Sequence, residues 1–232
     1  VRDENGNYAI FAELGSSPAS LAASKAADAF GLIEGNITQI SDAEQAYTQA
    51  ELTGTDTWVR LPKERWPEHW QGYKDPVCPL ILALYGHPDS GGMWEKHCNK
   101  HLTSVGFTTV PNWPSCFTHE KLELFLIVYV DDFKMSGPQQ NMKEAWELIK
   151  RGLKIDEPQD NGKFLGCEHT EYTVPYNKLV ELQIEMDPDS ESLMLNNKER
   201  QALKASNSKV NDEIMQVKKK LDLGTVRVME YN

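Results

Sequence analysis

Helix-like and strand-like patterns alternate along the 232 residues, which predicts a fold of the α/β or α+β class. The strongest strand pattern is the apolar run at 122–131, which is rich in β-branched and aromatic residues. The strongest helix patterns lie at 90–105 and 141–152, where apolar residues recur on one helical face. With 40% hydrophobic and 25% charged residues, the composition is that of a globular protein of one or two domains.

The first element that we expect is a helix beginning after Ser17 and Pro18. Serine is a common N-cap, proline suits the first helical turn, and an alanine-rich stretch follows. Glycine disfavours helix continuation, so the helix should end at Gly31 or Gly35.

Three strand-like segments follow this helix. The segment 36–41 predicts a strand that leads directly to Asp42. A short strand is expected at 57–61, and 77–85 predicts either a buried strand or an apolar turn. Between these two lies a stretch rich in tryptophan and proline, for which we expect a long ordered loop.

The second half of the chain predicts further elements of both kinds. In chain order they are a helix at 90–105, strands at 115–119 and 122–131, a helix at 141–152, a strand at 163–171 and a long polar helix at 196–221.

Charge and cysteine content narrow the class of protein. The net charge of −11 argues against tight, nonspecific binding to nucleic acid through overall charge. The four cysteines are widely spaced, which favours reduced thiols in an intracellular protein over a disulfide scaffold. No apolar stretch reaches the roughly 18 residues of a membrane span, so we expect no membrane partner. Because the chain opens at Val1 and not at methionine, we expect it to be a segment of something longer.

The apolar strand runs directly into two neighbouring acids, Asp131 and Asp132. Paired carboxylates at the end of a buried strand indicate a divalent-cation site, since the cation offsets the repulsion between the two carboxylates. The alternative is a hairpin turn that happens to use aspartate. A two-metal site needs a further carboxylate, and Asp42 is the best candidate, although aspartate before a short helical turn is usually an N-cap.

Several short motifs together resemble the reverse transcriptases of copia-type LTR retrotransposons. They cover about residues 10 to 170 in the order and spacing of that family. The motifs are Asp42 with Ala46 and Tyr47, Leu84-Tyr85-Gly86 with Trp94, Gly106-Phe107, Tyr129-Val130-Asp131-Asp132, and Phe164-Leu165-Gly166. Any one of them is weak evidence, whereas five in order are strong.

The resemblance implies an α+β fold with a right-hand polymerase palm, a ferredoxin-like antiparallel sheet with helices on one face. Residues 36–171 would form the palm, with a fingers segment inserted at about 57–90. Residues 1–35 would be partial fingers, and 172–232 a helical thumb or connection.

The resemblance also implies a reaction and its residues. The chain would extend a DNA primer on an RNA or DNA template, and two Mg²⁺ or Mn²⁺ ions would be bound by Asp42, Asp131 and Asp132. The other implied site residues are Tyr47, Ala46 and Asp89 at the nucleotide, Phe164, Leu165 and Gly166 as a primer grip, and Tyr129 and Val130 in the catalytic signature.

Further implied partners are deoxynucleoside triphosphates, the template-primer, and the integrase and RNase H of the same Pol polyprotein. The family's life cycle implies a cytoplasmic particle, the nucleus, or both.

The chain departs from the family in two places. Asp89, Gly91 and Gly92 stand where the family usually carries glutamine, proline and arginine. The basic finger strands of the family lie upstream of this chain. These departures leave an inactive retroelement remnant with the same fold as the chief alternative. An unrelated two-metal phosphotransferase or nuclease is the weaker one.

Overall fold

The computed structural model describes residues 16–175 and 225–231. The chain divides into two compact units, a first that ends at Glu168 and a second that begins at His169. In its described residues the first unit combines an antiparallel sheet with three α-helices, which confirms the α+β alternative of the predicted class.

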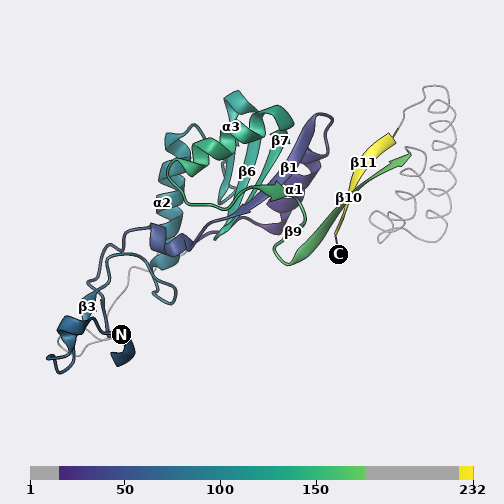
Figure 1. Ribbon diagram of the computed structural model, residues 1–232. Helices are drawn as coiled ribbons and strands as arrows, with labels where there is room; N and C mark the ends of the chain where they lie inside the picture. The colour runs from purple at the N-terminus through teal and green to yellow at the C-terminus, as the bar shows by residue number, and fades with distance from the viewer. Residues whose placement is uncertain (1–15, 176–224, 232) are drawn as a thin grey trace, which may run out of the picture. The chain divides into compact units, whose positions relative to one another are not determined.

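The central sheet of the first unit has six strands (Figure 1). In spatial order they are β4 (Thr108–Thr109), β5 (Cys116–His119), β6 (Leu124–Tyr129), β7 (Asp132–Pro138), β1 (Asn36–Asp42) and β8 (Gln159–Asp160). Every neighbouring pair is antiparallel. The strand β1, although first in the chain, lies between β7 and β8.

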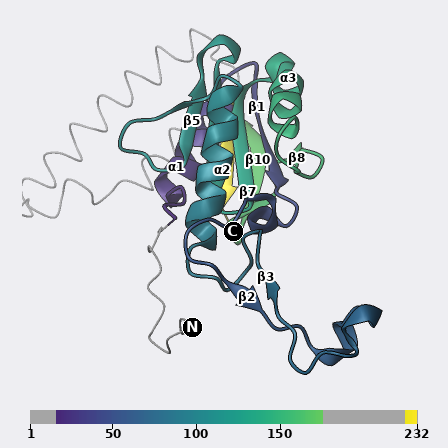
Figure 2. The ribbon, with the colours of Figure 1, turned by 90° about the vertical axis from the view of Figure 1, so that its left-hand side faces the viewer.

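Helices cover both faces of this sheet (Figures 1 and 2). The helices α2 (Ser90–Ser104) and α3 (Gln139–Lys150) share a core with alternate residues of β6, such as Leu126. On the opposite face, α1 (Leu21–Gly31) packs with Ile127. The expectation of helices on one face only was therefore wrong. The reason is that β6 is apolar on both faces, and such a strand needs cover on each side.

The helix α1 begins three residues later than the sequence predicted. Its N-cap is Ser20 and not Ser17, because the Ser20 Oγ accepts a hydrogen bond from the Ala23 N–H at 3.2 Å. At its other end Gly31 packs closely on β1. A Cβ at Gly31 would lie 1.9 Å from the Thr38 Oγ1 atom, so only glycine fits without rearrangement. The segment that was expected to be partial fingers thus supplies a helix that packs on the central sheet.

The expected insertion contains a separate two-stranded sheet, β2 (Trp58–Val59) with β3 (Cys78–Pro79). Between these strands lie the 3₁₀ turns η2 (Lys63–Arg65) and η3 (Glu68–Trp70). The prediction of a buried strand or apolar turn at 77–85 was wrong as to burial, since Ile81 is 75% exposed and Tyr85 54% exposed.

The segment 163–171, predicted as one strand, forms a hairpin. The strand β9 (Lys163–Phe164) pairs with the first residues of β10 (Cys167–Pro175). Leu165 and Gly166 connect them with φ of +50° and +79°, the combination that a type I′ turn requires.

In the second unit, the rest of β10 pairs antiparallel with β11 (Thr225–Tyr231). The described parts of 172–232 are therefore strand and not helix, because their β-branched residues favour an extended ladder. The helix expected at 196–221 lies outside the described residues. In the described part of the chain, none of the helices has the length and apolar character that crossing a membrane requires.

Candidate functional site

The two acids of the sequence motif lie at a strained hairpin turn between β6 and β7. Tyr129 pairs with Asp132, so Val130 and Asp131 are the two central residues of the turn. Val130 has φ of +59° whereas Asp131 is not among the residues with positive φ, which is the pattern of a type II′ turn. Glycine usually occupies that first position. A β-branched residue there stores backbone strain, and such strain concentrates at functional sites.

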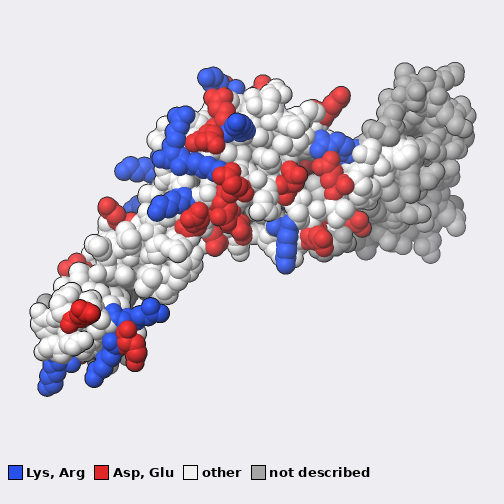
Figure 3. Space-filling view, viewed as in Figure 1, with Lys and Arg blue, Asp and Glu red and all other residues white. Residues whose placement is uncertain are grey.

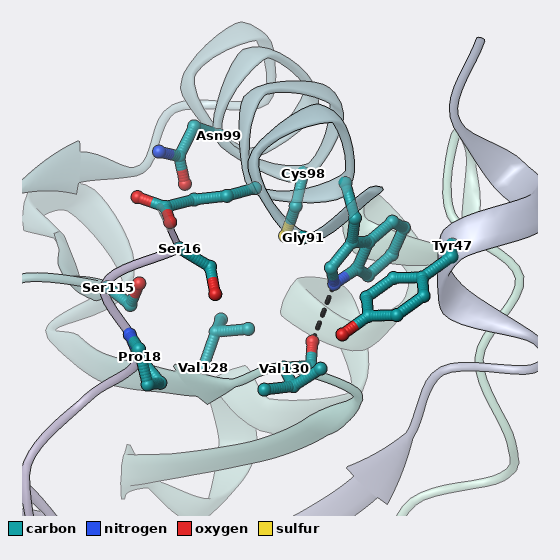
Figure 4. Close-up of a pocket in the computed structure, with 11 residues that line it drawn as sticks. Ser16, Pro18, Tyr47, Gly91, Cys98, Asn99, Ser115, Val128 and Val130 are labelled. Carbon is teal, nitrogen blue, oxygen red and sulfur yellow. Dashed lines mark hydrogen bonds between the residues drawn. The ribbon is translucent and has the colours of Figure 1, made fainter. Parts of the chain in front are cut away.

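A tryptophan from α2 holds this turn. The Trp94 Nε1–H donates a hydrogen bond of 2.6 Å to the Val130 carbonyl oxygen, shown as the dashed line in Figure 4. Trp94 is only 2% exposed, so this bond is shielded from water. The sequence placed Trp94 in a family motif and on the apolar face of a helix but gave it no role at the site.

The third predicted acid lies directly across from the hairpin. Asp42 ends β1 and is the register partner of Asp132, the first residue of β7. The Ala43 N–H donates a hydrogen bond of 2.7 Å to the Asp131 carbonyl oxygen, which joins the end of β1 to the turn. Asp42 is not a helix cap, because the 3₁₀ turn η1 (Ala46–Gln49) has Gln45 as its N-cap. The structure thus brings together the three aspartates that the sequence singled out.

The closeness of these acids changes the titration of one of them. Burial, a hydrogen bond with Asp42 and the negative charges of Asp42 and Asp131 raise the pKa of Asp132 to about 6. A neighbouring cation would remove this penalty by favouring the charged carboxylates.

The carboxylate oxygens are the ligand type that Mg²⁺ and Mn²⁺ prefer. In the described residues, no group of three or more His, Cys, Asp or Glu side chains is arranged to hold a metal ion. A pair of carboxylates nevertheless suits Mg²⁺, which is commonly bound by one or two carboxylates together with water and substrate phosphates. Asp42 and Asp132 therefore fit such an ion as a pair, with Asp131 adjacent.

Two tyrosines lie beside the acids. The rings of Tyr47 on η1 and Tyr85 have centroids 4.3 Å apart. Burial raises the pKa of Tyr85, and the charges of Asp131 and Tyr47 add to the shift, so Tyr85 lies within the field of the acids. Tyr47 was predicted at the nucleotide, whereas Tyr85 belonged to a motif without an assigned role. Ala46, also predicted at the nucleotide, is fully buried in the core against which Tyr47 packs.

A small cavity lies beside the turn (Figure 4). Tyr47, Trp94, Cys98 and Val130 are among the residues that line it. Its volume of about 20 Å³ is sufficient for about one water molecule. The cavity is therefore too small for a nucleotide, which would have to lie on the open side of the aspartates.

The remaining predicted site residues, Asp89 and the expected primer grip, differ in how accessible they are. Asp89 is the N-cap residue of α2 and only 3% exposed, and its Oδ1 has no hydrogen-bond partner among the described residues. Such burial leaves little of Asp89 available to a nucleotide. In the expected primer grip, Phe164 is buried against α1, whereas Leu165 and Gly166 form the turn and are more accessible.

One residue near the site was not predicted from the sequence. Lys134 on β7 is fully buried and forms an ion pair of 2.8 Å with Asp28 of α1. Burial lowers the pKa of Lys134, while the hydrogen bond and charge of Asp28 oppose that shift. A lysine between the apolar residues Phe133 and Met135, on the same side of the strand as Asp132, was the available signal.

A scan against protein-family models gave no match for this chain, and a search of curated proteins gave none either.

Proposed function

We propose that this chain is a polymerase domain of the reverse transcriptase type, with the central sheet as its palm. The observation that carries the proposal is the arrangement of the three aspartates. Asp42 and Asp132 face each other across neighbouring strands, and Asp131 lies beside them in a strained turn. Carboxylates placed in this way are suited to phosphoryl transfer, in which positioning and electrostatic stabilisation account for most of the catalysis.

In this proposal Asp42 and Asp132, which are register partners, would hold Mg²⁺ or Mn²⁺, and Asp131 would contribute to a second ion. The ions would lower the pKa of the primer 3′-hydroxyl and neutralise charge on the triphosphate. The protein fixes the two strand ends through the Ala43 to Asp131 hydrogen bond and holds the turn through Trp94. This preorganisation keeps the carboxylates in place before the substrates arrive.

The neighbouring residues suggest where the substrates would lie. The neighbouring rings of Tyr47 and Tyr85, which are tilted by 36° to each other, offer a wall for the sugar of an incoming deoxynucleotide, where they would exclude a 2′-hydroxyl. Leu165 and Gly166 would contact the primer. The other proposed partners are an RNA or DNA template and the integrase and RNase H of a Pol polyprotein. A cytoplasmic particle, the nucleus, or both would be the cellular location.

The charge distribution limits how a duplex could bind. The chain carries a net charge of −11, which gives no overall attraction for nucleic acid. On the face shown in Figure 3, Lys and Arg side chains gather over α2 and α3, with acidic side chains between them. Binding of the template-primer would therefore depend on local contacts and would be sensitive to salt.

Primer extension on an RNA template, with Mg²⁺ or Mn²⁺, tests the proposal. We expect the protein to add deoxynucleotides and the Asp132→Asn and Asp42→Asn variants to lose at least about a thousandfold in rate, since each removes a metal ligand. Asp160→Asn is the matched control, because this exposed aspartate makes the same chemical change on the neighbouring strand β8. The control should extend primers at the wild-type rate.

The possible outcomes separate the alternatives. Product that survives both substitutions would show that the activity comes from a contaminant. If the wild-type protein makes no product but binds Mn²⁺ through Asp42 and Asp132, the inactive remnant is favoured. If it cleaves nucleic acid without extending primers, an unrelated two-metal nuclease is favoured.

A further inference from the structure

A complete ion pair is buried beneath the candidate site, between β7 and α1. The Lys134 Nζ lies 2.8 Å from the Asp28 Oδ1, 3.0 Å from the Asp28 Oδ2 and 3.0 Å from the Ser24 Oγ. Lys134 and Asp28 are both fully buried. An ammonium group has three N–H donors, and these three oxygens all lie within hydrogen-bond distance of it.

Stability alone does not account for this pair. Removing two charges from water costs free energy that their attraction only partly offsets, and apolar residues of similar volume often serve as well or better. A buried ion pair does have one property that an apolar pair lacks. It is directional, so it favours a single arrangement of the elements that it joins and penalises any sliding between them.

The pair also joins a third element, the segment 161–166, which contains β9. The Asn161 Nδ2–H donates a hydrogen bond of 3.0 Å to the same Asp28 carboxylate. The Lys134 Nζ lies 4.5 Å from the centre of the Phe164 ring, within the range of a cation–π contact. Phe164 is 4% exposed and shares a core with residues of α1. The lysine is therefore the point at which α1, β7 and the segment 161–166 meet.

Lys134 lies two residues along β7 from Asp132, one of the candidate catalytic acids. Side chains two residues apart on a strand lie on the same face, so Lys134 and Asp132 share a face of β7. The same holds on β1, where Ile40 pairs with Lys134 and Asp42 pairs with Asp132. Any shift of β7 that displaced Lys134 would also displace Asp132 against Asp42.

We infer that Lys134 is a positioning residue, which holds the segment 161–166 and α1 against β7 and thereby aligns Asp132 with Asp42. The inference rests on the proposed function for its effect on catalysis, but its structural part stands independently. According to this inference, the buried ion pair keeps the site in one arrangement and does not serve to stabilise the fold.

The decisive variant replaces both charges together. In Lys134→Met with Asp28→Leu, the new side chains have a similar length and branching, and no unpaired charge is left behind. We expect this double variant to unfold at a urea concentration equal to or higher than that of the wild type. Amide hydrogen exchange over 161–166 should become at least about tenfold faster, because the directional contacts are lost. In primer extension, kcat should fall about tenfold or more while the KM for the nucleotide changes little.

Two further variants make the result interpretable. Lys163→Met is the matched control, since Lys163 is exposed on β9 within the same segment, and it should leave exchange and kcat unchanged. Phe164→Leu keeps an apolar side chain but removes the ring under the ammonium group, so it should speed exchange in 161–166 even if the double variant does not fold.

The measurements distinguish this inference from the proposed function. If the wild-type protein extends no primer, the proposed function fails, and hydrogen exchange alone decides whether Lys134 orders the segment. Unchanged exchange over 161–166 in both the double variant and Phe164→Leu would overturn the inference. Faster exchange with an unaltered kcat would overturn it as well, since the pair would then have no influence on the aspartates.

Discussion

Asp132 shows how the candidate site acts against the stability of the protein that contains it. Its pKa is raised to about 6, whereas an unfolded aspartate titrates near 3.9. Below about pH 4 the carboxyl is neutral in both states, and the folded protein has no charge to bury there. Between about pH 4 and pH 6 the unfolded chain releases this proton while the folded state retains it, so stability falls across this range until Asp132 is ionised next to Asp42 and Asp131.

Replacing Asp132 with asparagine should therefore stabilise the metal-free protein at alkaline pH. We expect Asp132→Asn to raise the free energy of unfolding at pH 8 by about 1 to 2 kcal/mol, with solvent screening taken into account, and to change it little at pH 4. Urea unfolding in the presence of a chelator measures both values. Asp160→Asn should show no such dependence on pH, and a loss of stability for Asp132→Asn at pH 8 would contradict the interpretation.

Single residues of the site were predictable from the sequence to different degrees. Asp131 and Asp132 were evident because charged residues directly after an apolar strand break an otherwise regular pattern. The proximity of Asp42 was an expectation from family motifs, and only the register of β1 with β7 establishes it. The role of Lys134 could not be predicted, since no local pattern reveals that its partner lies on α1, 106 residues away.

At the scale of elements, the N-terminal end of α1 offers a direct test of the observed helix boundary. Ser20→Ala removes the hydroxyl that accepts from the Ala23 N–H, and we expect it to lower the free energy of unfolding by about 1 kcal/mol. Ser17→Ala is the matched control and should change stability little, because Ser17 precedes the cap. Equal effects of the two substitutions in urea unfolding would show that the helix begins earlier.

Amphipathic helices were the elements that the sequence predicted best. The helix predicted at 90–105 is confirmed as α2, and the one at 141–152 as α3, shifted by two residues. Hairpins were predicted less well. Leu165 and Gly166 interrupt the strand expected at 163–171, because a non-glycine residue at positive φ leaves no clear sign in the sequence. The apolar run at 77–85 was taken for a buried element, since apolarity alone does not show whether a segment is covered.

At the scale of the whole molecule, a cation that binds between the strand ends should stabilise the fold. A ligand that binds only the folded state, at about a hundred times its Kd, adds roughly 2.7 kcal/mol to the free energy of unfolding. We therefore expect Mn²⁺ to raise the melting temperature of the wild-type protein, and Ca²⁺ to do so less, because it favours more ligands.

The variants Asp42→Asn and Asp132→Asn should abolish this increase, whereas Asp160→Asn should keep it. Thermal unfolding over a range of Mn²⁺ concentrations at pH 8 makes the measurement. An equal increase in all four proteins would show that the ion binds elsewhere.

The class of the fold was predicted from the sequence, but the order of the strands and the helices on both faces of the sheet were not. Alternating helix and strand patterns predicted a mixed fold, which the sheet with three helices confirms. The order of the strands depends on contacts between distant segments, and periodicity carries no information about them. The double-sided cover of β6 could have been expected from its continuous apolar run, without the alternation of a strand that faces water on one side.

The position of β1 in the sheet also determines at which stage of folding the candidate site forms. The hairpin of β6 and β7 closes over two residues, whereas the contact between Thr38 and Ser136 joins residues that are 98 apart. Closing so long a loop costs more entropy, and contacts of this kind form later than local ones. We therefore expect folding intermediates in which the hairpin is formed while Asp42 is still distant. The repulsion between Asp42 and Asp132 then arises only after most of the sheet is in place to withstand it.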